Sequence, residues 1–307
     1  MGRYTIRRML QLVFVLFAAT FLIYAGVFLI PGDPIRALAG DRPLPESVQQ
    51  VLRERYNLND PFLVQYVKYI GNALTGDFGT DFRGRDVSDL MAQRFPVTVR
   101  LTLVAITFET FLGILAGVFA GLRRQSFIDS LVLVSTTTVI SIPVFVLGFT
   151  LQLYLGVQLN LFPICCLRDG WFSYLLPGIV LGSLSLAYVA RLTRTSLVEN
   201  MRADYVRTAT AKGMPRGRVV GRHALRNSLI PVVTFLGADL GNLMAGAIIT
   251  EGIFNVPGIG RAVFDGVRQQ EGTVVVGIVT ALVLVFALSN LFVDLLYAVL
   301  DPRIRYE

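Results

Sequence analysis

The chain has 307 residues, of which 54% are hydrophobic and only 16% are charged, and its formal net charge is +7. Soluble domains carry roughly 25% charged residues, and several apolar stretches here reach the roughly 20 residues needed to cross a bilayer. These features exclude an ordinary soluble protein and predict a single all-α, polytopic membrane domain over residues 1–307. The positive charge lies in loops between apolar stretches, so nucleic acid is not an expected partner.

The first predicted span covers residues 9–30, which is roughly 33 Å of helix and long enough to cross the hydrocarbon core. Arg3, Arg7 and Arg8 precede it. Because positive residues favour the cytoplasmic side, we expect the N-terminus in the cytoplasm.

A polar segment, residues 31–96, follows and has eight basic and nine acidic residues. With a net charge near −1, it is expected to lie on the extracytoplasmic side. Short amphipathic helices are predicted at residues 47–56 and 63–74. A connection of this length should form a small ordered subdomain.

Five further spans are predicted at residues 97–122, 128–155, 172–190, 229–250 and 273–300. Pro143 lies within the third of the six spans and predicts a kink or break there. The loops 156–171 and 251–272 should be outside, the second with a short helix over 260–267. The basic pair Arg123-Arg124 and the C-terminal end should be inside. The prediction is about six transmembrane helices with both termini cytoplasmic.

The most basic part of the chain lies between the fourth and fifth spans, at residues 191–228. It has nine basic residues and only two acidic ones, so it should face the cytoplasm. Asp204 is a predicted N-cap of a short helix, and Gly213 suits the left-handed position after its end. Pro215 then suits the first position of a second helix. The simpler alternative is a solvated loop that binds lipid headgroups.

The amino-acid sequence of this stretch resembles that of a known family. The EAA loop of ABC-importer permeases has the pattern E-A-A-x3-G-x9-I-x-L-P, which Ala209, Gly213 and Leu225 match. The positions that depart from it are Arg207, Thr208, His223 and Arg226. The longer segment DYVRTATAKG…HALRNSLIP resembles the variant of the EAA loop in dipeptide and oligopeptide permeases of the DppB/OppB type. The resemblance extends along essentially the whole chain. It is carried by the segments PGDP, LNDPFLVQY, GDFGTDF, RFPVTVRLTL, EGIFNVPGIGRAVFDGV and DLLYAVLDPR.

This resemblance implies a type I ABC-importer permease, multi-pass in the plasma membrane of a prokaryote. In that family, the partners are a second permease, two ATPase subunits that hold ATP and Mg²⁺, and an extracytoplasmic substrate-binding protein. The expected cargo is a dipeptide or oligopeptide, although glutathione and nickel permeases share the scaffold. The resemblance implies that this chain itself binds no cofactor, and that the following residues couple it to an ATPase: Asp204, Tyr205, Arg207, Ala209, Lys212 and Gly213.

Glu109 lies in the middle of the second predicted span, and Asp239 lies within the fifth. Ionisable groups in hydrocarbon usually face a cavity or a partner. Both are therefore candidates for the translocation path, where they could meet the ammonium of a peptide. The alternative is that they are neutral or hydrogen-bonded at a helix interface.

Cys165 and Cys166 are the only cysteines and lie in a predicted outside loop. An oxidising location permits a disulfide between them, although adjacent cysteines bridge only through a strained ring, and two free thiols are the alternative. With no third ligand nearby, a metal site is not expected.

Three motifs are absent from the sequence: the nucleotide-binding P-loop G-x-x-x-x-G-K-[ST], the zinc-hydrolase motif H-E-x-x-H and the serine-hydrolase motif G-x-S-x-G. A nucleotide site or a hydrolase site in this chain is therefore unsupported, and we do not expect an enzyme. Energy would come from partner ATPases or from an ion gradient. The alternatives to an ABC permease are a stand-alone, proton-coupled carrier that uses Glu109 and Asp239, and a receptor or scaffold.

Overall fold

The computed structural model describes residues 2–28, 46, 49, 50, 53, 59–164 and 170–300, with residues 2–6 and 292–300 described by their backbone alone. Within these ranges the chain is helical without any strand, and Thr80 and Asp86 form an isolated β-bridge. The predicted all-α fold is confirmed. The chain divides into two compact units, Met1–Thr98 with Pro257–Leu291 and Val99–Val256 with Phe292–Glu307.

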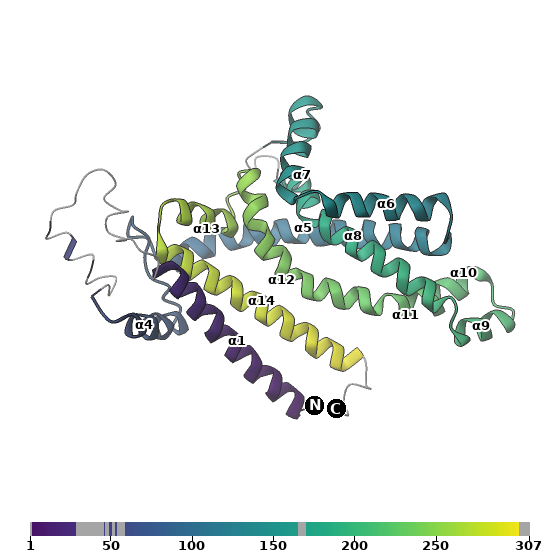
Figure 1. Cartoon of the computed structure of the whole chain (residues 1–307), viewed down its shortest axis with the longest axis horizontal. Helices are drawn as coiled ribbons and strands as arrows, with labels where there is room; N and C mark the ends of the chain where they lie inside the picture. The colour runs from purple at the N-terminus through teal and green to yellow at the C-terminus, as the bar shows by residue number, and fades with distance from the viewer. Residues whose placement is uncertain are drawn as a thin grey trace. The chain divides into compact units, whose positions relative to one another are not determined.

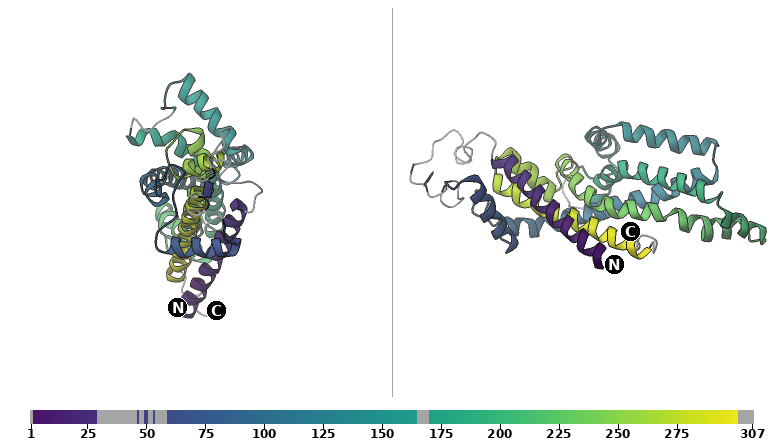
Figure 2. Two further views of the ribbon diagram at one scale, coloured as in Figure 1. Left: turned by 90° about the vertical axis from the view of Figure 1, so that its left-hand side faces the viewer. Right: turned by 60° about the horizontal axis from the view of Figure 1, so that its bottom comes forward.

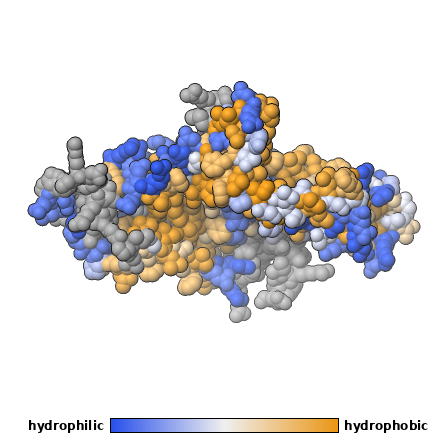
Figure 3. Space-filling view, turned by 45° about the horizontal axis from the view of Figure 1, so that its top comes forward, coloured by the Kyte–Doolittle hydropathy of each residue, from blue (hydrophilic) through white to orange (hydrophobic). Residues whose placement is uncertain are grey.

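Five helices are long and apolar enough to cross a membrane, and a bent helix pair makes a sixth candidate. The five are α1 (Gly2–Phe28), α5 (Val87–Leu122), α8 (Leu175–Asn200), α12 (Ile230–Ile253) and α14 (Gly272–Leu300). Large apolar side chains such as Phe14, Leu22 and Phe111 are exposed on them, and hydrophobic surface covers much of the face shown in Figure 3. The predicted number of spans is thus confirmed, whereas the side on which the termini lie stays a prediction.

In the first unit, aromatic rings join α1 to α4 (Phe62–Leu74). Phe21 and Tyr24 of α1 pack on Phe62 and Tyr66, and the hydroxyl of Tyr66 lies 3.0 Å from that of Thr20. The helix predicted over 63–74 is therefore confirmed and packs through its rings on the first span. The helix predicted over 47–56 lies outside the described residues.

The same unit contains α13 (Ile259–Arg268), which joins the end of the fifth span to α14. The hydroxyl of Thr98 accepts a hydrogen bond of 2.8 Å from the backbone N–H of Ile259, the first residue of α13. A side chain at Gly266 would meet Val275, with its Cβ 3.1 Å from the nearest methyl group. The short helix predicted over 260–267 is confirmed, and it is fastened closely at both ends.

In the second unit, α5 and α8 pack backbone against backbone. A Cβ at Gly182 would lie 2.7 Å from the carbonyl oxygen of Ala105, and one at Gly117 would lie 2.5 Å from that of Ala190. Small residues let membrane helices approach this closely. Any movement of α8 must therefore carry the facing part of α5 with it.

The third predicted span is broken, as Pro143 predicts. It consists of α6 (Phe127–Ser141), then α7 (Val144–Leu151) with the π-helical η1 (Gln152–Gln158), and the two parts are bent by 102°. Ile142 before the proline is extended, with φ −93° and ψ 124°, which is the conformation that a following proline imposes.

The fourth span differs from its predicted end. After the 3-10 turn η2 (Gly170–Tyr174), α8 runs to Asn200, ten residues beyond the predicted end at residue 190. The reason is that Arg191 and Arg194, expected in a loop, bind to side chains of α6 as part of the helix. Cys165 and Cys166 lie outside the described residues, so their pairing stays a prediction.

Candidate functional site

Between the fourth and fifth spans lies the short helix α9 (Asp204–Ala211). Asp204 is its first helical residue and Ala203 is its N-cap, so the prediction of Asp204 as the N-cap is wrong by one residue. The carboxylate still lies beside the positive end of the helix dipole. The difference has a local cause, because Ala203 already has the extended backbone that an N-cap adopts, with ψ 149°.

The end of α9 is set by Gly213, which has φ +75°. The backbone N–H groups of Gly213 and Met214 donate to the carbonyls of Thr210 and Ala209 at 2.9 and 3.3 Å. This pair of hydrogen bonds is the Schellman motif. The motif requires a left-handed backbone conformation at position 213, which glycine adopts without strain. The predicted C-terminal stop is therefore confirmed. Pro215 follows as the N-cap of α10 (Arg216–Arg218), not as its first helical residue.

One face of α9 is buried. Val206 and Ala209 are each 3% exposed and pack with Leu197 of α8 and with the π-helical η3 (Val219–Leu225). Val118 and Leu122 of α5 border the same cluster. We call this set the α9 core, made of Leu197, Val206, Ala209, Val219 and Ala224. Because it joins α9 to the ends of two spans, a displacement of α9 must move both.

The opposite face of α9 is open and charged. Asp204 and Arg207 are 97% and 78% exposed and form a loose ion pair of 3.7 Å, while Tyr205 is 40% exposed and donates a hydrogen bond to the Asn200 side chain. Lys212 and Gly213 are also exposed. Five of the six residues predicted to couple to an ATPase are therefore presented outward, whereas Ala209 supports them from the core.

Exposed arginines continue this surface beyond α9. They lie on α10, on η3 and on α11 (Arg226–Ser228), namely Arg216, Arg218, Arg222 and Arg226. Figure 1 shows α9 and α10 beyond the C-terminal end of α8, with α11 leading from them to α12, and the right-hand view of Figure 2 shows the same green segments. We call the exposed residues of α9 through α11 the coupling surface. Its charge and shape suit a partner with an acidic or polar groove.

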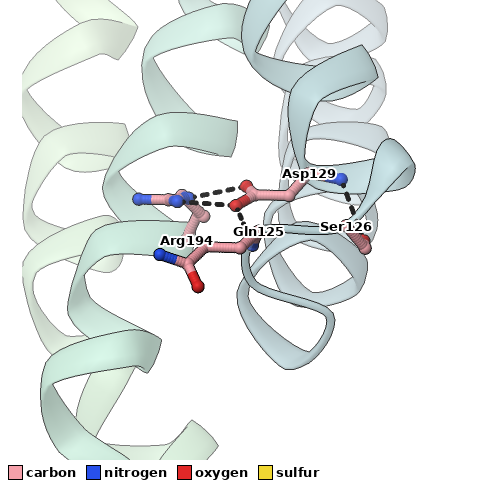
Figure 4. A network of polar contacts seen from close by, with 4 residues as sticks. All are labelled: Gln125, Ser126, Asp129 and Arg194. Carbon is pink, nitrogen blue, oxygen red and sulfur yellow. Dashed lines mark hydrogen bonds and ion pairs between the residues drawn. The ribbon is translucent and has the colours of Figure 1, made fainter.

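An ion pair holds the same end of α8 to α6 (Figure 4). The guanidinium of Arg194 donates to both oxygens of Asp129, at 2.8 and 2.7 Å. The backbone N–H of Gln125 donates to the same carboxylate at 2.9 Å, and Ser126 caps the start of α6. The Asp129 side chain is buried and that of Arg194 is 21% exposed, so loss of the arginine would leave a buried carboxylate without its charge partner, which is destabilising. The sequence alone gives no sign that Asp129 and Arg194 are partners, because they are 65 residues apart.

Glu109 and Asp239 are brought together from α5 and α12. Glu109 is fully buried, Asp239 is 5% exposed, and Glu109 lies beside Asp239 and Ser185. Asn242 donates to Asp239 at 3.3 Å, whereas the Glu109 oxygens have no hydrogen-bond partner among the described residues. The pair thus lies inside a helix interface in this state, and its predicted place on a translocation path remains a prediction.

The helices and the coupling surface together define a polytopic α-helical membrane protein that presents a basic helical surface between two spans. Residues 113–306 match the family described as the inner membrane component of binding-protein-dependent transport systems, and residues 1–102 match the N-terminal part of such a component. The chain is 36% identical to the dipeptide transport system permease protein DppB of Alkalihalophilus pseudofirmus over 99% of both chains. It is 39% identical over the full length of both chains to the glutathione transport system permease protein GsiC of Escherichia coli K12 and of Shigella dysenteriae serotype 1.

The chain belongs to the family of inner membrane components of binding-protein-dependent transport systems, which are the permeases of ABC importers. The resemblance noted in the sequence is confirmed.

Proposed function

We propose that this chain is a permease subunit of an ATP-driven importer of peptides, that it forms half of the translocation path, and that α9 couples it to a cytoplasmic ATPase. The observation that carries the coupling proposal is the α9 core, which fixes an exposed, charged helix to the ends of α5 and α8. The peptide cargo is supported by the relatives, which are named for dipeptide and for glutathione transport, and glutathione is itself a short peptide.

The mechanism follows from this connection. When ATP binding closes the two ATPases, the coupling surface is displaced with the subunit on which it is docked. The α9 core transmits that displacement to α8, and the backbone contacts at Gly117 and Gly182 pass it on to α5. The path then changes between inward-open and outward-open states, and ATP drives the change because the ATPases bind it differently in the two states.

The proposed assembly has a second permease, two ATPase subunits with ATP and Mg²⁺, and an extracytoplasmic substrate-binding protein. It lies in the plasma membrane of a prokaryote, with residues 31–96 outside and the coupling surface inside. This chain has no part in hydrolysis and only transmits its effect. A role of Glu109 and Asp239 in the path would require α5 and α12 to separate, because both side chains are buried between helices here.

The test is Gly213→Val in the complete importer, in proteoliposomes with the binding protein. Nothing lies within 4 Å of a Cβ at Gly213, so the strain comes from the left-handed backbone alone. We expect normal membrane insertion but loss of ATP-driven peptide uptake. Gly76→Val is the matched control, because Gly76 also has a left-handed backbone, with φ +87°, and free space around it, and it lies outside the coupling surface.

Unchanged uptake in Gly213→Val would overturn the coupling assignment. Uptake that persists in the wild type without any ATPase, and that proton uncouplers abolish, would instead support the ion-coupled carrier, with Glu109 and Asp239 as the residues to test.

A further inference from the structure

Two arginines of α8, one turn apart, have different partners on the neighbouring helix α6. Arg194 is neutralised by Asp129 in the bidentate pair described above. Arg191 instead donates from Nε to the hydroxyl of Thr136 at 3.2 Å and from its terminal nitrogen to the hydroxyl of Thr137. Throughout the described ranges, no carboxylate lies within ion-pair distance of Arg191. Its charge is therefore held in place without being cancelled.

The two threonines orient the guanidinium and leave much of it free. Their hydroxyls donate to carbonyls one turn back in α6, those of Val132 and Leu133 at 2.8 and 2.6 Å, so toward Arg191 they act as acceptors. A guanidinium has five N–H donors in a planar fork. The contacts among the described residues use two of these donors, which leaves three for a further acceptor.

The surface beside Arg191 is polar although it belongs to an apolar span. Thr137, Thr138 and Ser141 are exposed and share one face of α6 at helical spacing. Arg191 lies within Gly170–Asn200, a helical segment that is long and apolar enough to cross a membrane. A charge is unfavourable against lipid tails and usually faces a water-filled cavity or another protein.

We propose that Arg191 and the hydroxyl face of α6 form a carboxylate-binding site on the transport route, which takes the C-terminal carboxylate of a translocated peptide. This inference rests on the proposed function and names a contact for its substrate. Arginine suits the role because its fork matches the two oxygens of a carboxylate. The threonines suit the role too, because they are neutral and do not compete with the peptide carboxylate for the arginine. Because they add no charge of their own to the site, they also allow the peptide to leave again.

The experiment uses the complete importer in proteoliposomes and compares Arg191→Gln with the wild type. Two probes are transported, a dipeptide with a free carboxylate and the same dipeptide as its C-terminal amide. Hydrogen bonds to charged groups contribute about 1.5–3 kcal/mol. We therefore expect the ratio of dipeptide to amide uptake to fall by roughly tenfold to a hundredfold in the variant. The binding protein is unchanged, so its own preference cancels when the two ratios are divided.

Arg123→Gln is the matched control, because Arg123 is an exposed arginine at the cytoplasmic end of α5 and its loss removes the same charge. Its uptake ratio should equal that of the wild type. Arg191→Lys covers the case in which Arg191→Gln does not assemble, since lysine keeps the charge and loses only the fork. A smaller fall of the ratio is expected for it.

An unchanged ratio in the assembled variant would overturn the proposal. An equal loss of both probes, matched by dependence of the wild type on added phosphatidylglycerol, would also overturn it, because Arg191 would then bind a lipid phosphate. Failure of the wild type to transport any peptide would refute the proposed function and not this site alone.

Discussion

Two short helices that connect spans, α9 and α13, are built alike and held very differently. Helix α13 buries five residues, and its first N–H is bound by Thr98 of α5. Helix α9 buries only Val206 and Ala209. The fastened helix has little surface left for a partner, whereas the lightly held one presents most of its residues. This difference in burial fits the proposed roles of α13 as a structural connector and of α9 as the coupling helix.

The ion pairs of the two helices differ in exposure in the same way. Arg261 and Asp265 of α13 form an ion pair that is about two-thirds buried, whereas Arg207 and Asp204 of α9 are almost fully exposed. Exposed pairs contribute little to stability, so the charges of α9 are available to a partner at little cost to the fold.

The largest expected effect is that of Ala209→Leu, which breaks the α9 core. Adding side-chain volume to a packed core costs about 1–3 kcal/mol, which corresponds to roughly a fivefold to 150-fold loss in an equilibrium. We expect ATP-driven uptake to fall in that range, while the permease pair still assembles. Ala92→Leu is the control, because Ala92 is exposed in α5, outside both the α9 core and the coupling surface. Equal uptake in the two variants would show that the buried face of α9 is not needed for coupling.

A smaller and local effect is expected for Thr98→Val at the start of α13. The variant leaves the buried N–H of Ile259 without its acceptor, at a cost of about 1–3 kcal/mol. Hydrogen exchange should become faster in the first turn of α13 while the amides of α9 keep their rates. Thr107→Val is the control, since Thr107 is exposed in the same helix and bonds only to its own backbone. Faster exchange in α9 would mean that the two helices do not respond independently.

The smallest effect is a pH dependence on the α13 side. Asp81 lies in a cleft that α13 also lines. Burial opposes its ionisation, but hydrogen bonds from Arg85 and Arg83 outweigh that cost and hold the pKa of Asp81 below its usual 3.8. Its stabilisation is therefore present above a pH of about 3.8 and is lost as the pH falls through the folded-state pKa.

Glu271 lies in the same cleft, and its contribution to stability depends on pH in the opposite direction. Burial raises its pKa, and the negative charge of Asp81 adds to the shift, so its contribution is present at acid pH and is lost as the pH rises through its folded-state pKa. We expect Asp81→Asn to melt below the wild type at pH 7, with a gap that narrows below a pH of about 3.8. Asp77→Asn controls for the loss of one nearby carboxylate. A gap that stays constant with pH would contradict the assigned role of Asp81.

Much of the fold could be predicted because its signals are local. Apolar length set the spans, Pro143 set the break in the third, and Gly213 set the end of α9, since each depends on the backbone chemistry of a few adjacent residues. The end of α8 could not be predicted in this way. Whether Arg191 and Arg194 continue the helix depends on Thr136, Thr137 and Asp129, which lie more than 50 residues away.

The candidate site shows the same division. Its charge and its position between spans follow from the sequence, whereas the inward direction of Ala209 depends on packing against Leu197 and Val219. Likewise, Glu109 and Asp239 could each be singled out as buried charges, but only the packing of α5 and α12 makes them neighbours. A single sequence carries no signal for that contact.

The most direct test of the coupling assignment is site-specific photo-crosslinking in cells that express the whole importer. A photoreactive residue is placed at Arg207, on the open face of α9, and in a second strain at Val267, which is 59% exposed on α13. We predict an adduct with the ATPase subunit from position 207 and none from position 267. An ATPase adduct from position 267, or its absence from position 207 in an active importer, would contradict the assignment of α9 as the coupling helix.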